Sequence, residues 1–173
     1  MNDDKDKRTI AQWQEHIHWL ARSKGWWDEK SEQEQRVERE LAVIAMTHME
    51  PSAVLEKVRV GGVLSFGDID MKEAVAEHRA RLKSLSPRQI AMLAKLALIH
   101  SEVTEAVEAV LAGDEPLRIS EGGKPEGVPA EVADVVIRCL DFCGGYGISA
   151  SEAVITKHDY NAKRSHKHGG KLA

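Results

Sequence analysis

Hydrophobic residues recur three and four positions apart along most of this chain, which is the spacing of one face of an α-helix. In residues 10–24, Trp13, Ile17 and Leu20 form one apolar stripe, and Gly25 is a stop signal for the helix. We therefore expect an all-α fold. The same pattern predicts further helices over residues 31–50, 52–60, 71–85, 87–113, 129–144 and 149–164.

Capping residues mark where two of the predicted helices begin. Ser86, Pro87 and Gln89 supply an N-cap, a proline in the first turn and a capping-box partner for the helix that follows. Ser149 and Glu152 form a second capping box ahead of the last helix. These local signals place two helix starts independently of any tertiary contact.

Glycine and proline predict where the helices are interrupted. Gly61 and Gly62 separate two short apolar runs and predict a small hairpin. Residues 113–129 are rich in Gly and Pro and predict a flexible connector of 17 residues. The next helix is expected to end at Gly144 and Gly145.

Acidic residues gather in two of the predicted helices. Glu102, Glu105 and Glu108 follow one another at intervals of three, and Glu131 and Asp134 repeat that interval in the next helix. Residues three apart share one helix face, so each cluster directs neighbouring carboxylates the same way. Two helices that do this usually converge on a positive charge, most simply a divalent metal.

A solvated acidic face is the alternative, and it fits the first cluster poorly. Such a face normally carries Lys or Arg four residues on, whereas alanines occupy those positions here. The opposite stripe predicts an apolar core face, so the helix is expected to be buried on both sides. Glutamate is rarely buried unless it is paired or bound to metal. The stripe consists of Leu93, Leu96, Ala97, Val103, Val107 and Leu111.

The second cluster leaves two interpretations open. Asp134 has Arg138 four residues on, so an ion pair within the helix accounts for it without a metal. Asp141, two turns after Asp134, extends the acidic line along nearly the same face. Glu108 lies at the edge of the first cluster and is a weaker ligand candidate than Glu102 or Glu105.

The last predicted helix carries the opposite charge. Lys157, Asn161 and Arg164 are spaced four and three residues apart on one helix line, and Lys171 follows in the tail. Taken alone, they are an ordinary basic C-terminus that complements the helix dipole. Combined with the upstream carboxylate cluster, they also suit the binding of a polyphosphate. Metal ions bridge carboxylates to phosphate oxygens, and Lys and Arg neutralise the remaining phosphate charge.

Composition narrows the class of protein. The chain has 173 residues and a net charge of −4, which argues against a dedicated nucleic-acid binder. It shows neither a signal-peptide pattern at its start nor an apolar run of membrane-spanning length, so we expect a cytoplasmic protein.

Cys139 and Cys143 are expected to be reduced core residues. The adjacent Trp26 and Trp27 are either core anchors or a stacking surface for a base.

Taken together, the acidic pairs Glu102-x-x-Glu105 and Glu131-x-x-Asp134, with 25 residues between them, resemble the MazG-like all-α nucleoside triphosphate pyrophosphohydrolases. The resemblance covers residues 10–29 and 91–171. Ser101 stands where the family often has a further Glu. The blocks that carry the resemblance are, in order, ARSKGWWDE, LALIHSEVTEAVEA, PAEVADVVIRCLDFCGGYGI and KHDYNAKRSHKHGGK.

The resemblance implies an antiparallel helical bundle, assembled as a homodimer or homotetramer. It also implies that Mg²⁺, with Mn²⁺ as a substitute, supports cleavage of a nucleoside triphosphate into the monophosphate and pyrophosphate. The four acidic residues of the two pairs would be the metal ligands, and Glu105 and Glu102 would be catalytic. The implied substrate contacts are Lys157, Asn161, Arg164 and Lys171 on the phosphates and Trp26, Trp27 and His16 near the base.

The chain also departs from that family. We interpret it as one domain, residues 1–173, with a largely helical insertion over residues 30–90 that serves as a lid, an oligomer contact or a partner site. The insertion holds ten basic and ten acidic residues and is not an electrostatic arm. Two other functions stay open. One is a non-catalytic Mg–nucleotide-binding regulator that acts through the insertion, and the other is a purely structural helical oligomer.

Overall fold

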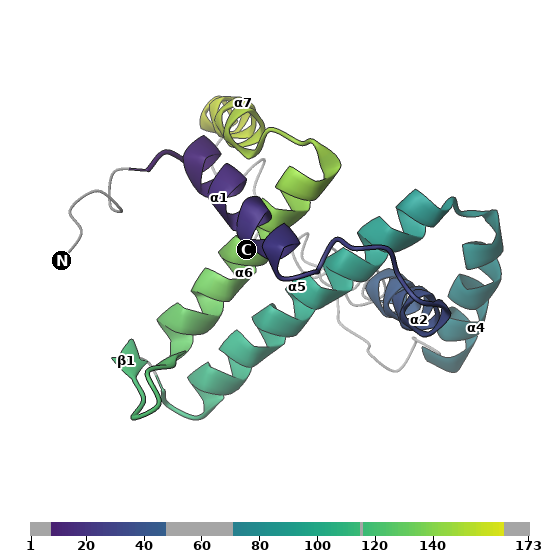
Figure 1. Ribbon diagram of the computed structural model, residues 1–173, viewed down its shortest axis with the longest axis horizontal. Helices are drawn as coiled ribbons and strands as arrows, with labels where there is room; N and C mark the ends of the chain where they lie inside the picture. The colour runs from purple at the N-terminus through teal and green to yellow at the C-terminus, as the bar shows by residue number, and fades with distance from the viewer. Residues whose placement is uncertain (1–7, 48–70, 115, 165–173) are drawn as a thin grey trace. The chain divides into compact units, whose positions relative to one another are not determined.

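The computed structural model describes residues 8–47, 71–114 and 116–164, and this part of the chain is mostly helical (Figure 1). The all-α fold class is confirmed. A single turn of 3-10 helix, η3, covers Leu82–Ser84. The α-helices are α1 (Ile10–Ser23), α2 (Glu32–Thr47), α4 (Met71–Arg81), α5 (Pro87–Leu111), α6 (Val128–Tyr146) and α7 (Ala150–Ala162).

The chain divides into two compact units. The first comprises residues 1–30 and 96–153, and the second comprises residues 31–95 and 154–173. The division after Lys30 falls where the predicted insertion begins, but the second unit also takes in residues 91–95 and the C-terminal segment. In the first unit α1 packs against α6, and in the second α2 packs against α4.

Helix starts agree with the capping residues. The Gln89 amide N–H donates to Ser86 Oγ at 3.3 Å, and the Ser86 N–H donates to Gln89 Oε1 at 2.9 Å, which is the predicted capping box. Thr9 and Gln12 form an equivalent box at the start of α1. The predicted short helix over 52–60 and the hairpin around Gly61 lie outside the described residues.

The connector after α5 is more ordered than the sequence indicates. Two short antiparallel strands, β1 (Arg118–Ile119) and β2 (Pro125–Glu126), pair within it. The Arg118 guanidinium bonds the Asp114 carboxylate at 2.7 Å and also contacts Glu126. These hydrogen bonds, first to Asp114 and then to Glu126, raise the pKa of Arg118. The connector therefore contains a short β-hairpin that the sequence pattern did not predict.

Helix α6 does not end at Gly144 and Gly145 as predicted. It continues to Tyr146, and Gly147 closes it with a φ of 70°. The two earlier glycines serve close packing instead: a Cβ on Gly145 would lie 1.9 Å from the Trp27 ring. Glycine inside a helix costs stability unless something requires the space, and here the Trp27 ring requires it.

One side chain of α1 fixes the turn between α6 and α7. The Gln14 side-chain amide donates to the Ile148 carbonyl at 2.6 Å and accepts from the Ala150 N–H at 3.0 Å. Both backbone groups lie at the gap between two helices, where intrahelical partners are missing. This glutamine of α1 thereby satisfies one backbone carbonyl just after α6 and one backbone N–H at the start of α7.

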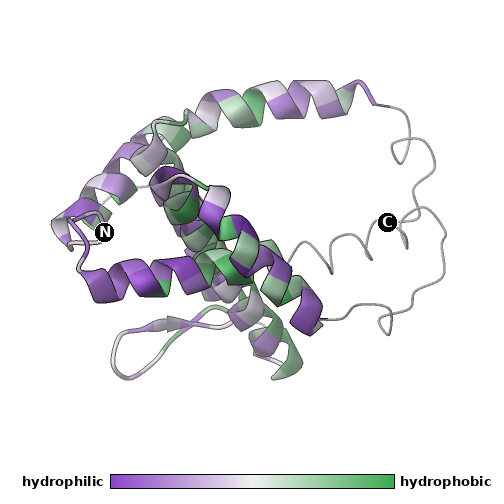
Figure 2. Cartoon of the chain, turned by 90° about the vertical axis from the view of Figure 1, so that its right-hand side faces the viewer, coloured by the Kyte–Doolittle hydropathy of each residue, from purple (hydrophilic) through white to green (hydrophobic). Residues whose placement is uncertain are grey.

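The predicted core face of α5 is largely exposed in the single chain. Val107 is 52% exposed and Leu111 is 82% exposed, whereas Ala97 is buried. Figure 2 shows hydrophobic and hydrophilic residues alternating along the helices, as the spacing predicts. The pattern is amphipathic, but in the described residues the apolar stripe of α5 is not covered as a core face. No helix among those described is both long enough and apolar enough to cross a membrane.

Candidate metal centre

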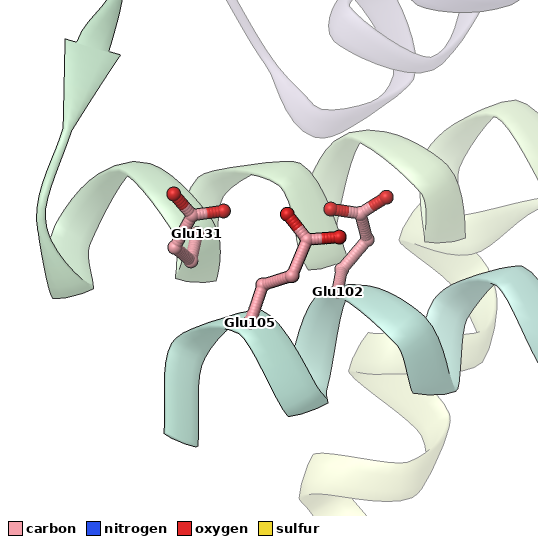
Figure 3. Close-up of side chains that lie close together, drawn as sticks. All are labelled: Glu102, Glu105 and Glu131. Atoms are coloured by element: carbon pink, nitrogen blue, oxygen red, sulfur yellow. The ribbon is translucent and has the colours of Figure 1, made fainter. Parts of the chain in front are cut away.

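Three carboxylates from two helices meet in the first unit. Glu102 and Glu105 project from α5 toward Glu131 of α6, and each contributes an oxygen atom lying within 4.8 Å of the others (Figure 3). Glu102 is buried, Glu131 is half-buried and Glu105 is exposed. Hard divalent cations prefer such oxygen donors. The chemistry of the donor set therefore fits Mg²⁺ or Mn²⁺.

The chain path between the helices brings Glu131 opposite the two glutamates of α5. The Val128 N–H donates to the Asp114 carbonyl at 2.9 Å, so the start of α6 is tied to the end of α5. Gly127 has a φ of 94°, and a Cβ there would lie 2.2 Å from the Pro116 carbonyl oxygen. Glu131 then falls in the first turn of α6, where the helix dipole favours a negative charge.

Glu102 has a cationic partner that the sequence did not reveal. The Arg138 guanidinium donates through Nε to Glu102 Oε1, and the Glu102 side chain is only 7% exposed. The glutamates of α5 lack a basic residue four positions on, and the cation that pairs with Glu102 comes from α6 instead. Glu105 and Glu131 form no ion pair within the described part of the chain. Of the three acids, only Glu102 therefore has a cationic partner in the described part of the chain.

The structure brings together three of the four predicted ligands. Asp134 is exposed on α6, one turn after Glu131, and lies outside the cluster. Its predicted alternative, an ion pair with Arg138, does not form, because that guanidinium reaches Glu102 instead. Glu108 is exposed and also lies outside the cluster.

Asp141 does not extend the acidic line but belongs to a separate polar network. Its Oδ1 lies 3.0 Å from His18 Nδ1 and accepts from the Trp27 indole N–H at 2.9 Å. The His18 and Trp27 rings meet edge to face at 5.0 Å. Residues 18 and 141 are 123 positions apart, and no local spacing connects them. Sequence reasoning missed His18 for that reason.

The aromatic residues predicted to lie near the base differ in exposure and packing. Trp27 is half-buried and packs on the Tyr146 ring at 5.5 Å, so it serves as a core anchor. Trp26 is 61% exposed. His16 stacks on Trp19 with ring centroids 5.9 Å apart. A shallow pocket of about 490 Å³ on α1 is lined by Glu15, His18, Trp19, Arg22 and Ser23.

The predicted phosphate contacts belong to the second unit. Lys157 and Asn161 lie on α7, Arg164 follows the helix, and all three are exposed. The Lys157 ammonium and the Arg164 guanidinium lie 5.5 and 5.8 Å from the centre of the Tyr160 ring. Lys171 is outside the described residues. Convergence of these side chains with the carboxylates stays a prediction.

The two cysteines are free thiols, as expected, but they are only half-buried. Burial raises the pKa of the Cys139 thiol, and burial together with the neighbouring Cys139 raises that of Cys143. A thiol with a raised pKa is mostly protonated at neutral pH and is a poor nucleophile. Nucleophilic chemistry at this pair is therefore disfavoured.

Comparison with known proteins leaves the family open, since no protein-family model, curated protein or solved structure matches the chain.

Proposed function

We propose that this protein hydrolyses a nucleoside triphosphate to the monophosphate and pyrophosphate, with Mg²⁺ bound at Glu102, Glu105 and Glu131. The observation that carries the proposal is the meeting of these three carboxylates from two helices within 4.8 Å. The resemblance of the acidic pairs to the MazG-like family points to the same chemistry. A noncanonical nucleotide or a deoxynucleotide from the cytoplasmic pool is the proposed substrate.

Charge explains why the cluster suits this reaction. Glu102, Glu105 and Glu131 bring three negative charges together, and Arg138 offsets one of them. A polyphosphate cannot approach such a group without divalent cations between them. When bound, Mg²⁺ lowers the pKa of a coordinated water and neutralises phosphate oxygens. Glu105, as the exposed member of the cluster, would be the carboxylate that accepts a proton during hydrolysis.

Other residues complete the proposed site. Asp134, one turn beyond Glu131 on α6, would be the fourth ligand. Lys157 and Asn161, helped by Arg164 and Lys171, would hold the phosphate tail. At the base end, the exposed Trp26, with His16 of the first unit, would supply aromatic surface, while Trp27 serves as a core anchor.

Product identification tests this proposal directly. Purified protein, Mg²⁺ and a panel of deoxynucleoside and noncanonical triphosphates are expected to yield monophosphate and pyrophosphate in equal amounts. Chromatography of the nucleotides and a coupled pyrophosphate assay would follow both products. Orthophosphate as the sole primary product, or no turnover of any nucleotide, would contradict the proposal.

A non-catalytic nucleotide-binding regulator is the rival function. It predicts the same carboxylate cluster and a saturable affinity for Mg–nucleotide, but no conversion to products. Isothermal titration calorimetry with each nucleotide, run beside the product assay, separates the two functions. Binding without turnover across the whole panel would favour the regulator.

We also propose that the chain assembles as a homodimer or homotetramer through its exposed apolar stripes. On α5, Leu96, Val103, Val107 and Leu111 of the apolar stripe are exposed, and on α6 Val132 and Val136 are about half exposed. Among the described residues no large side chain is fully buried. A second copy that covers these stripes would supply the missing core.

The assembly is tested by mass in solution. Light scattering after gel filtration is expected to show a dimer or tetramer for the wild type. Val107→Asp places a charge in the α5 stripe and is expected to shift the population toward monomer. Ser101→Asp, exposed on another face of the same helix, is the matched control and should leave the mass unchanged. A monomeric wild-type chain would contradict assembly.

A further inference from the structure

The Arg138–Glu102 ion pair engages the carboxylate of a predicted metal ligand. Glu102 is the most buried member of the carboxylate cluster, with a side chain 7% exposed, while the Arg138 side chain is 39% exposed. The guanidinium contacts Glu102 Oε1 through Nε. A divalent cation that bound Glu102 would therefore compete with the Arg138 guanidinium for the same carboxylate.

The position of Arg138 on α6 explains how it reaches the cluster. Arg138 follows Glu131 by seven residues, two helical turns, so both side chains lie on the α6 face that meets α5. Within residues 8–47, 71–114 and 116–164, no other carboxylate pairs with its guanidinium. Its planar group retains donors on the two Nη atoms for another acceptor.

Burial makes this particular pair consequential. A buried carboxylate that loses its only cation is strongly destabilised, because the desolvated charge is no longer compensated. Glu102 therefore needs a positive partner, and Arg138 supplies it in the structure. Glu105 is exposed and can be solvated by water, so it has no comparable need.

We propose that Arg138 is the resident counter-cation of the cluster, which a divalent ion must displace from Glu102, so that this arginine sets the metal affinity. The inference rests on the proposed function, because it concerns the same three carboxylates. It goes beyond that function by assigning a regulatory role to a residue that is not a ligand. Weak metal binding would then be a built-in property of the chain.

The test is metal binding alone, without nucleotide. Wild type and Arg138→Gln are stripped of metal with a chelator and titrated with Mn²⁺, with free Mn²⁺ followed by electron paramagnetic resonance. Arg138→Gln is expected to bind Mn²⁺ about tenfold more tightly, the order expected when one competing part-buried ion pair is removed. Glutamine still donates a hydrogen bond but leaves the Glu102 charge uncompensated, so the variant is expected to be less stable, and circular dichroism checks that it is folded before the titration.

Two further variants make the result specific. Arg79→Gln also removes one positive charge and one ion pair, that with Glu40, but leaves the cluster intact, and its Mn²⁺ affinity should equal that of the wild type. Arg138→Lys keeps the charge without the guanidinium fork and should bind Mn²⁺ with intermediate affinity.

The outcomes separate this inference from the proposed function. Equal Mn²⁺ affinity in wild type and Arg138→Gln would overturn the counter-cation role while leaving the metal site in place. Weaker binding in Arg138→Gln would overturn it too, because the arginine would then support the site. Absence of Mn²⁺ binding in every variant would remove both the inference and the proposed function.

Discussion

Replacing Glu105 with glutamine is expected to abolish nucleotide hydrolysis while leaving the fold unchanged. The neutral amide is a much poorer ligand for Mg²⁺ than a carboxylate, and it cannot accept the proton of a coordinated water. Loss of a residue that merely supports a metal ligand costs about 10–100-fold, so loss of a direct ligand should exceed that. The measurement is kcat/KM on the best substrate of the panel, with circular dichroism as the check on folding.

Glu108→Gln is the matched control for Glu105→Gln. It removes the same charge from the same helix three residues on, but Glu108 is exposed and lies outside the carboxylate cluster. Its kcat/KM should stay within a few-fold of the wild type. Full activity in Glu105→Gln, or equal losses in the two variants, would show that the cluster geometry does not carry the reaction.

Replacing Gly145 with alanine is expected to destabilise the protein even though alanine is the better helix former. The added Cβ would lie 1.9 Å from the Trp27 ring, so the ring or the helix must move. Such overpacking costs about 1–3 kcal/mol, which outweighs the helix-propensity gain of about 1 kcal/mol. Because Trp27 donates to Asp141, the shift should also disturb the His18 network.

Thermal unfolding measures this effect. A loss of about 2 kcal/mol lowers the Tm by roughly 4–8 °C in a chain of this size. Gly122→Ala is the control, because its added Cβ would meet no atom within 4 Å, and its Tm should hardly change. An unchanged or raised Tm in Gly145→Ala would mean that Trp27 packs elsewhere.

Local signals were sufficient to predict most helix boundaries. The capping box at Ser86 and Gln89 depends on atoms three residues apart, so the chain specifies it without tertiary contacts. The pairing of acids three residues apart likewise places Glu102 and Glu105 on one face of α5 whatever packs there. Glu131 could be added because it repeats that spacing, with Asp134, in the next helix.

Packing decided what those local signals left open. In the sequence, Gly145 predicts a helix stop. In the structure it lies inside α6 and makes room for the ring of Trp27, a residue more than a hundred positions earlier in the chain. The apolar stripe of α5 is equally visible in the sequence, yet periodicity states only that a face is apolar. It does not state which surface covers that face.

Arg138 shows the physical reason most clearly. Its sequence position favours Asp134 four residues earlier, since both lie on one helix face. In the structure it turns to Glu102, because a buried carboxylate gains more from a cation than an exposed one does. The sequence by itself determined the helices, their amphipathic faces and the acidic pairs. Burial, which no short stretch of sequence encodes, decided which charges meet.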